Sequence, residues 1–153
     1  MSGQKNKIRL IGRREFVNVP SLGVTALEAK IDTGAYTSSI HCERIDLVQE
    51  NDRPVLYFNL EENGTVYRFE DFGQKKIKNS FGEMEERFVI RVVVHIGRKK
   101  ILSTISLSNR DNMRYPILIG RRLLKAKFLI DVSKIHTGGL NLKRTINQLQ
   151  KKL

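Results

Sequence analysis

The sequence predicts an all-β fold, a closed β barrel of roughly six short strands. Residues 24–32 alternate between apolar and polar side chains, as in a strand with one buried face. Residues 55–60 and 66–70 flank a Glu-Glu-Asn-Gly segment, whose Asn-Gly pair is typical of a hairpin turn. Residues 88–96 and 101–107 are two further apolar segments, joined by a short basic turn. Strands of this length between turns favour a barrel or a sandwich.

The alternation in residues 24–32 also predicts which side chains the strand buries. Successive side chains of a strand point to opposite faces of the sheet. The core-facing set should therefore be Thr25, Leu27, Ala29 and Ile31.

Helical patterns are few. One short helix is expected after Gly120, within residues 121–126. A second candidate is the C-terminal tail, residues 138–153, which carries an apolar stripe at helical spacing beside a basic face. The stripe consists of Leu142, Ile146, Leu149 and Leu153. Such a stripe more often packs on its own domain than on a partner.

The 153 residues are enough for one domain with a core. We expect a flexible N-terminus at residues 1–7, a barrel domain at residues 8–137 and a basic amphipathic tail at residues 138–153. Hydrophobic residues make up 40% and charged residues 29%, which excludes a disordered tail, a fibre and a membrane protein. Cys42 is the only cysteine and no secretory signal is visible, so we expect a cytoplasmic protein.

The net charge of +12 is unevenly distributed. Residues 1–86 hold 12 Lys and Arg against 14 Asp and Glu, whereas residues 87–153 hold 16 against 2. The basic half should attract anionic partners, which include nucleic acid, a ribosome surface, an acidic peptide and an anionic lipid surface. It is also consistent with a basic face that only keeps the protein soluble.

Metal and thiol chemistry find little support. The residues suited to zinc are His41, His95, His136 and Cys42, without a His-Glu-x-x-His or a cysteine pair. We therefore predict no metal and no cofactor. Cys42 lacks the local signature of a thiol enzyme and is interpreted as a buried structural residue.

Two segments carry the functional signal. In residues 30–35 an apolar strand runs into Asp32, Thr33 and Gly34, which alone could be an ordinary turn. In residues 115–121 a second apolar strand ends at Gly120.

Together these segments resemble the retropepsin-like aspartic peptidases. In that fold Asp-Thr-Gly lies at the bottom of the cleft, and a downstream apolar-apolar-Gly strand braces its loop. The resemblance is closer to a bacterial branch labelled ATP-dependent zinc proteases, and it covers residues 10–131. Its hallmarks match Ile11-Gly12-Arg13-Arg14-Glu15, Ala29-Lys30-Ile31-Asp32-Thr33-Gly34-Ala35, Ser108-Asn109-Arg110-Asp111-Asn112-Met113-Arg114 and Ile119-Gly120-Arg121. The sequence contains no ATP motif and no zinc ligand set, so its chemistry favours the aspartic mechanism over that label.

The resemblance implies a role for each matched residue. Catalysis is assigned to Asp32, Thr33 and Gly34. Substrate binding is assigned to Ala35, Tyr36, Ser80, Phe81, Gly82 and Arg114. Support of the site is assigned to Asn109, Arg110, Asp111, Ile119, Gly120 and Arg121. From the residues alone, the charged cluster of Arg110, Asp111 and Arg114 could hold structure through ion pairs, which is the interpretation we favour, or contact an acidic substrate.

Residues 72–88 are interpreted as a flap with Ser80-Phe81-Gly82 at its tip, although an ordinary mobile hairpin would have the same composition. The bacterial branch commonly has Asp-Ser-Gly-Gly where this chain has Asn79-Ser80-Phe81-Gly82. It commonly has Arg in place of Tyr36, where viral retropepsins have Asp. Both departures affect the expected substrate preference.

Hydrolysis of a peptide bond by carboxylates uses two of them, one as a general base and one as an acid. Only one Asp-Thr-Gly is present, so the simplest solution is a homodimer in which each copy contributes Asp32. The resemblance implies that the Thr33 hydroxyl bonds across the two-fold axis.

These observations support a first hypothesis and two alternatives. The first is a cytoplasmic, homodimeric aspartic endopeptidase that acts on acidic or glutamate-rich protein segments. The resemblance adds that the bacterial branch is associated with ATP-grasp ligases that add glutamates to a ribosomal protein. The second is a non-catalytic basic module on the same scaffold that binds RNA, a ribosome or an acidic protein. The third is a zinc-dependent peptidase, as the branch label says.

Overall fold

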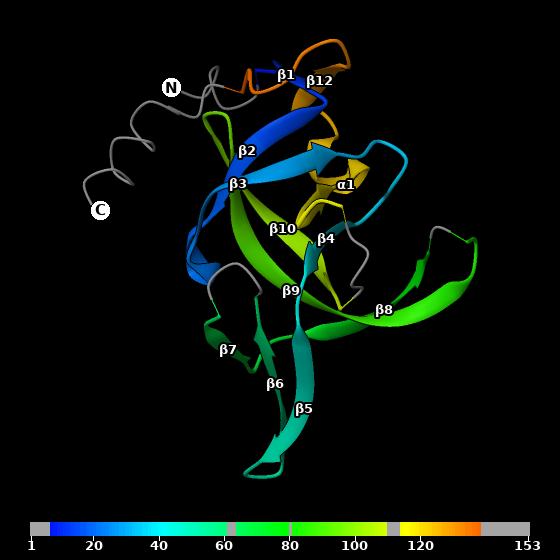
Figure 1. Cartoon of the computed structure of the whole chain (residues 1–153). Helices are drawn as coiled ribbons and strands as arrows, with labels where there is room; N and C mark the ends of the chain where they lie inside the picture. Colours follow the sequence, from blue (N-terminus) through cyan, green and yellow to red (C-terminus); the bar gives the residue numbers. More distant parts are fainter. Residues whose placement is uncertain (1–6, 61–63, 80, 110–113, 139–153) are drawn as a thin grey trace.

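A computed structural model of the chain describes residues 7–60, 64–79, 81–109 and 114–138. Almost all regular structure in these ranges is β-strand (Figure 1). The strands are β1 (Arg9–Gly12), β2 (Arg14–Val19), β3 (Val24–Ile31), β4 (Ser38–His41), β5 (Arg44–Glu50), β6 (Arg53–Asn59), β7 (Val66–Phe69), β8 (Gly73–Lys78), β9 (Met84–Ile96), β10 (Lys99–Ser108), β11 (Ile117–Ile119) and β12 (Phe128–Asp131). The short helical segments are η2 (Pro20–Leu22) and α1 (Arg121–Leu124).

The main sheet of the described chain closes on itself. Its strands are hydrogen-bonded in the order β10-β4-β11-β3-β2-β9, and β9 pairs in turn with β10. β8 continues the sheet outward from β9, while β5, β6 and β7 form a separate three-stranded sheet. The predicted all-β fold with a closed ring of strands is therefore confirmed. In the described ranges no helix is long and apolar enough to cross a membrane.

The interior of the ring is filled by aliphatic side chains. Every strand of the ring contributes at least one fully buried residue, including Val17, Ala29, Ile40, Ile90, Ile105, Ile117 and Ile119. Burying a side chain of this size stabilises the fold by roughly 1.5–3 kcal/mol relative to leaving it in water. The core thus fixes the relative positions of β3, β4 and β11, the three strands nearest the candidate site.

Strand β3 corrects one expectation. Ala29 and Ile31 are buried as predicted and Leu27 packs against the core, but Thr25 is exposed and Val24 is buried instead. The cause is an irregularity at Ala26, whose φ of 51° lies in the left-handed region. There the pairing with β2 shifts register between Val17 and Val19. A shift of this kind moves side chains to the opposite face of a strand.

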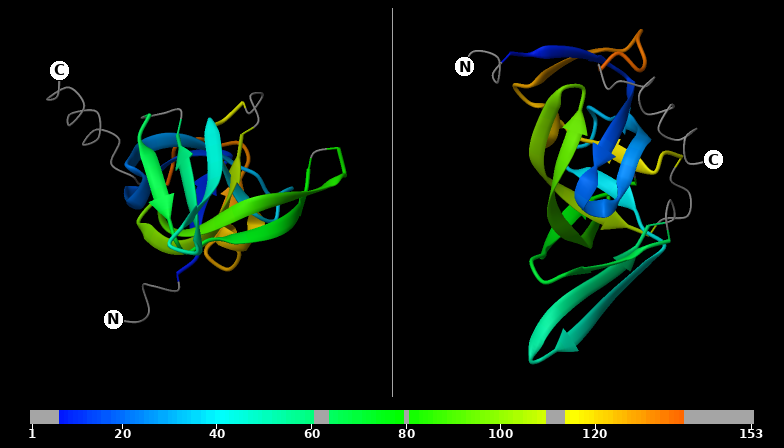
Figure 2. Two further views of the ribbon diagram at one scale, coloured as in Figure 1. Left: turned by 90° about the horizontal axis from the view of Figure 1, so that it is seen from below. Right: turned by 90° about the vertical axis from the view of Figure 1, so that its left-hand side faces the viewer.

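Two hairpins extend beyond the ring (Figures 1 and 2). The β5–β6 hairpin extends away from the ring at the lower end of the view in Figure 1. The β8–β9 hairpin leaves it on the side of α1 and corresponds to the flap expected from residues 72–88.

The expected short helix after Gly120 is present, and it ends at Leu124 rather than at residue 126. Lys125 has left the helical conformation, and Ala126 has a φ of 63°. The predicted helix of the tail lies outside the described residues, because these end at Gly138.

Glu15 holds the last described segment against the body of the protein. Its side chain is only 2% exposed, and the carboxylate accepts hydrogen bonds from the Gly12, Thr137 and Gly138 amides at 2.7, 3.1 and 2.8 Å. The Thr137 hydroxyl donates a further bond at 3.2 Å. A buried carboxylate is stable only when its oxygens are satisfied in this way. Glu15 therefore fixes the start of β2 and residues 137–138 together.

Replacing Glu15 with Ala should lower the free energy of unfolding by about 3 kcal/mol, because four donors lose their buried acceptor. Urea unfolding followed by circular dichroism measures this change. The matched control is Glu86→Ala, an exposed carboxylate whose loss should change stability by less than about 0.5 kcal/mol. A loss below about 1 kcal/mol for Glu15→Ala would contradict the assigned role.

Candidate active site

Asp32 lies at the end of β3, where the chain turns out of the sheet. Its amide donates a hydrogen bond to the Ile119 carbonyl at 2.8 Å, and the Ile31 amide donates to the Arg13 carbonyl at 2.9 Å. The half-buried carboxylate accepts a bond from the Gly34 amide at 3.2 Å on Oδ1. The backbone on both sides of Asp32 is therefore anchored, and the carboxylate is oriented by its own turn.

The loop after Asp32 is braced by the chain around Gly120. The Arg121 amide donates to the Ala35 carbonyl at 2.8 Å, and the Arg122 amide donates to the Tyr36 carbonyl at 3.0 Å. The Arg121 guanidinium also donates to the Thr33 carbonyl at 2.9 Å. The carbonyls of Thr33, Ala35 and Tyr36 thus have partners on the segment that begins α1. Leu118-Ile119-Gly120, the expected bracing strand, lies beside the end of β3 and the loop that follows Asp32.

Gly120 is required by close packing. A Cβ atom there would lie 2.7 Å from the Tyr36 carbonyl oxygen and 2.9 Å from the Thr37 carbonyl carbon, closer than real Cβ atoms come. The Gly120 amide also donates to the Ser38 hydroxyl at 3.0 Å. Any side chain at this position would push the loop of residues 32–37 away from its brace.

Asp32 opens into a cleft of about 1170 Å³ between the loop, the β8–β9 hairpin and the start of β2. Its lining is strongly basic. Eight described side chains with positive charge border it, namely Arg13, Arg14, Lys30, Lys76, Lys78, Arg87, Arg114 and Arg121. Asp32 is the one carboxylate among the described residues that line it. A concave surface of one sign of charge concentrates ligands of the opposite sign.

The structure brings together some of the predicted site residues and leaves others apart. Gly34, Ala35, Tyr36 and Arg114 line the cleft with Asp32. Thr33 is exposed beside the cleft and does not line it. Asn109 is exposed, and Ile119 is buried under the loop, which fits a supporting position.

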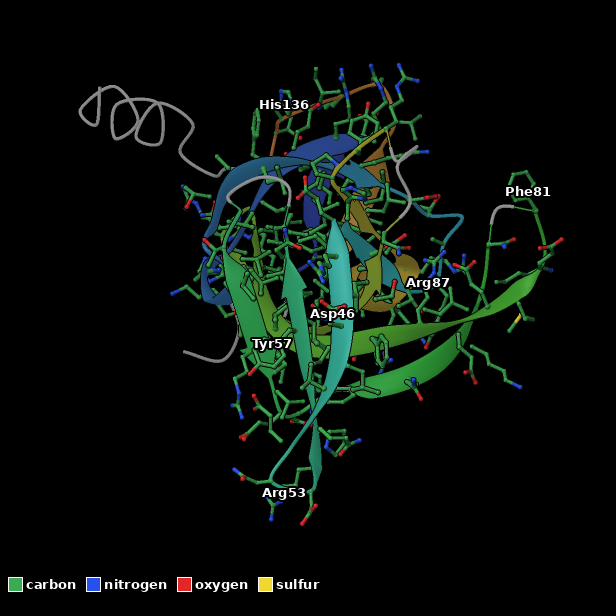
Figure 3. All side chains as sticks on the ribbon, turned by 60° about the horizontal axis from the view of Figure 1, so that its bottom comes forward. Asp46, Arg53, Tyr57, Phe81, Arg87 and His136 are labelled. Atoms are coloured by element: carbon green, nitrogen blue, oxygen red, sulfur yellow. The ribbon has the colours of Figure 1, made fainter. Side chains whose placement is uncertain are left out.

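The predicted flap tip lies away from the cleft lining. Phe81 is 82% exposed at the end of the β8–β9 hairpin, and neither Phe81 nor Gly82 borders the cleft (Figure 3). Ser80, Arg110 and Asp111 lie outside the described residues, so their predicted roles stay predictions.

Several cleft residues were missed by sequence reasoning. They are Lys30, Ser39, Lys76, Lys78, Arg87 and Ser108, together with Arg13 and Arg14. Arg13 and Arg14 fall in the first segment of the family resemblance, Lys30 falls in the second and Ser108 in the third, so a signal existed for these four. No sequence signal marked Lys76, Lys78 and Arg87, because it is the curvature of β8 and β9 that brings these hairpin residues to the same cleft as Asp32.

Neither a thiol nor a metal site is found in the described part of the chain. Burial raises the pKa of Cys42 to about 12, which keeps the thiol protonated and unreactive at neutral pH. No three His, Cys, Asp or Glu side chains of the described ranges gather so that they could hold a metal ion.

The ring of strands, the Asp-Thr-Gly loop and its glycine brace define a retropepsin-like fold. A family model matches residues 10–138, and the chain belongs to this RimB-like family, described as the retropepsin-like aspartic endopeptidase RimB. The family description agrees with the predicted retropepsin-like class and does not carry the zinc-protease label.

Relatives of this chain are longer proteins. A "probable alpha-L-glutamate ligase" of Shewanella halifaxensis is 36% identical over 131 residues, which cover 82% of this chain and 29% of the relative. Proteins of the same name from Desulfotalea psychrophila and Parasynechococcus marenigrum are 35% and 31% identical, over 80% and 85% of this chain and 28% and 29% of their own lengths. The chain thus spans less than a third of these relatives. A solved Legionella pneumophila protein of unknown function superposes with a TM-score of 0.69 at 26% identity, covering 86% of this chain and 99% of that one.

Substituting Gly120 with Ala should destabilise the protein by roughly 1–3 kcal/mol, because the added methyl group overlaps the backbone of Tyr36 and Thr37. Hydrogen exchange should also show lost protection at the Asp32 and Arg121 amides, whose bonds join the loop to its brace. Gly73→Ala is the matched control, since its methyl group meets only a Val89 side chain at 3.3 Å. Unchanged exchange at Asp32 in the Gly120 variant would show that the brace does not depend on the glycine.

Proposed function

We propose that this chain is an aspartic endopeptidase in which Asp32 is the catalytic carboxylate. The observation that carries the proposal is the placement of Asp32 on a braced loop at the floor of a large cleft. Membership of a family described as aspartic endopeptidases supports it. In this mechanism one carboxylate accepts a proton from the attacking water while a second, protonated carboxyl group donates to the carbonyl oxygen of the peptide bond.

The second carboxylate comes from another copy of the chain. Asp32 is the one carboxylate among the described residues of the cleft lining, and a two-fold axis would supply its equivalent. Two carboxylates within a few ångströms share one proton, which divides them into a base and an acid. Thr33 and Gly34 are exposed beside Asp32, as residues that meet a second copy or a substrate must be in a single chain.

The substrate is an acidic protein segment, and a glutamate-rich one fits best. Among the described residues that line the cleft, eight cations surround a single carboxylate, which favours a ligand with several negative charges. The relatives named as probable alpha-L-glutamate ligases combine a segment like this chain with a much longer remainder. An enzyme that cleaves next to glutamate residues would suit that context, and a cytoplasmic location would bring it to such substrates.

Asp32→Asn should lower the cleavage of a glutamate-rich peptide by at least roughly a hundredfold, because the amide cannot accept the proton of the water. Mass spectrometry of the products measures the rate, and circular dichroism confirms that the variant is folded. Asp46→Asn is the control, since Asp46 is paired with Arg44 on β5 and lies outside the cleft lining (Figure 3). Cleavage by the Asp32 variant at the original rate would overturn the proposal.

Mixing the wild-type chain with an equal amount of the Asp32→Asn chain tests the shared site. If both carboxylates are needed, only about one quarter of randomly formed dimers are active, whereas independent chains would retain about one half of the activity. The one-half result would contradict the dimeric mechanism while leaving Asp32 catalytic.

A second candidate function is the binding of RNA through a basic surface outside the cleft. Arg9, Lys99 and Lys127 gather near the start of β1, and Lys99 Nζ lies 5.6 Å from the centre of the Phe128 ring. Partial burial and the neighbouring Arg9 and Lys127 cations lower the pKa of Lys99. Cations held this close together favour a ligand with several phosphates.

The affinity for duplex RNA, followed by fluorescence anisotropy, should then fall about tenfold or more between 50 and 200 mM salt. The double variant Lys99→Gln/Lys127→Gln should flatten this salt dependence. The control Arg53→Gln/Lys75→Gln removes the same charge from the two hairpins and should leave it unchanged. Absent or salt-insensitive binding would exclude this candidate.

A further inference from the structure

Two of the described cations of the cleft lie within ion-pair distance of a carboxylate of the protein itself: Arg14 is 3.8 Å from Glu28, and Arg87 is hydrogen-bonded to Glu85. Arg87 on β9 lines the cleft, and its guanidinium contacts the carboxylate of Glu85 through Nε and Nη2. The Arg87 side chain is only 13% exposed, whereas that of Glu85 is 34% exposed. Arg87 lies on the part of the hairpin near the body, with Phe81 at the far end (Figure 3). Of the two partners, Glu85 is the one that can turn into water.

Two other cleft arginines, Arg13 and Arg121, bind a different kind of group. The guanidinium groups of Arg13 and Arg121 donate to the backbone carbonyls of Val132 and Thr33 at 3.0 and 2.9 Å, so these two side chains support the scaffold. Arg87 instead holds a side-chain carboxylate, which is the group that an acidic substrate would also present. An arginine binds such a group through two parallel donors.

The same carboxylate is connected to the tip of the hairpin. Asn79 donates from its amide nitrogen to the second oxygen of Glu85 at 3.4 Å. The Asn79 side-chain oxygen accepts bonds from the Phe81 and Glu83 amides at 2.9 and 3.0 Å and so shapes the turn at the tip. Glu85 therefore stands between a cleft cation and the residue that organises the tip.

We propose that Glu85 occupies on Arg87 the position that a carboxylate of the substrate takes, which makes Arg87 the specificity-determining residue for an acidic side chain. This inference rests on the proposed function. Exchange of one carboxylate for another keeps Arg87 paired, so the mostly buried cation is never left without a counterion. Glu85, once displaced, can be hydrated, and its contact with Asn79 is released. Binding of the substrate side chain would thereby change the contacts of Asn79, which shapes the turn at the tip of the hairpin.

Competition predicts opposite effects for the two partners. The full chain carrying Asp32→Asn binds without cleaving, and the probes are fluorescein-labelled hexaglutamate and hexaglutamine peptides, followed by fluorescence anisotropy. Glu85→Gln should tighten the binding of hexaglutamate several-fold, because Arg87 is freed. Arg87→Gln should weaken it about tenfold. Neither substitution should change the binding of hexaglutamine.

Glu86→Gln is the matched control. Glu86 is the next residue of β9, is exposed, lies outside the cleft lining as Glu85 does, and its substitution removes the same charge. The Glu86→Gln substitution should change hexaglutamate binding by less than about twofold, since the charge of an exposed side chain is largely screened by water and salt. An equal gain from Glu85→Gln and Glu86→Gln would reduce the effect to net charge and overturn the proposal.

A structural role for the pair would give a different result. If the pair only stabilised the hairpin, both substitutions would weaken binding, and both peptides would be affected; that outcome overturns the inference. If circular dichroism shows that the Arg87→Gln variant is unfolded, the Glu85→Gln variant alone tests the inference. Tighter hexaglutamate binding would support it, and weaker binding would overturn it. If the binding effects have opposite signs but the wild-type chain cleaves neither peptide, the inference stands and the peptidase assignment fails.

Discussion

The candidate site depends on one backbone contact, the pairing of β11 with the end of β3. Ile119 lies beside Ile31 in a parallel register, and the Asp32 amide donates to the Ile119 carbonyl. Parallel strands belong to the interior of a fold, and β11 lies between β3 and β4 with its ends buried. Through this contact, the buried core fixes the backbone of Asp32, while the Asp32 carboxylate stays partly exposed to solvent. The side chain can be exposed to a substrate without its main chain being mobile.

The brace also explains why a loop with exposed residues keeps one conformation. Loops without hydrogen bonds lose little by moving, but in the loop of residues 32–37 the backbone of Asp32, Thr33, Ala35 and Tyr36 is hydrogen-bonded. Gly120 permits this because its lack of a side chain lets two backbone segments meet. Gly120 and Asp32 are 88 positions apart in the sequence. The Asp32 loop keeps its position only if the chain around Gly120 packs against it. This long-range dependence is what made the two sequence segments more informative together than either was alone.

The limits of the sequence follow from the same geometry. The Asp32 loop, its brace and the short helix could be predicted because each is a local pattern with a known partner pattern. The Ala26 irregularity could not be predicted, since alanine at a positive φ has no compositional signal and the register shift depends on β2. Glu15 stood in a recognised segment, but its role required knowing that residues 137–138 return to it. Arg87 reaches the cleft only through the curvature of two paired strands, which no periodicity encodes.

The basic lining of the cleft divides into cations that the fold uses and cations that it leaves for a ligand. Arg13 and Arg121 donate to backbone carbonyls, so their charge reaches the cleft while their side chains hold the scaffold. Removing Arg121 would change both the loop and the electrostatic field, and removing Arg13 would change both the contact with Val132 and the field, so the two effects could not be separated. Lys76, Lys78 and Arg87 lie on a hairpin that leaves the ring, where a change of charge does not alter the brace. Under the proposed function, variation in specificity within this fold should therefore concentrate on β8 and β9, where charges can change without disturbing the brace.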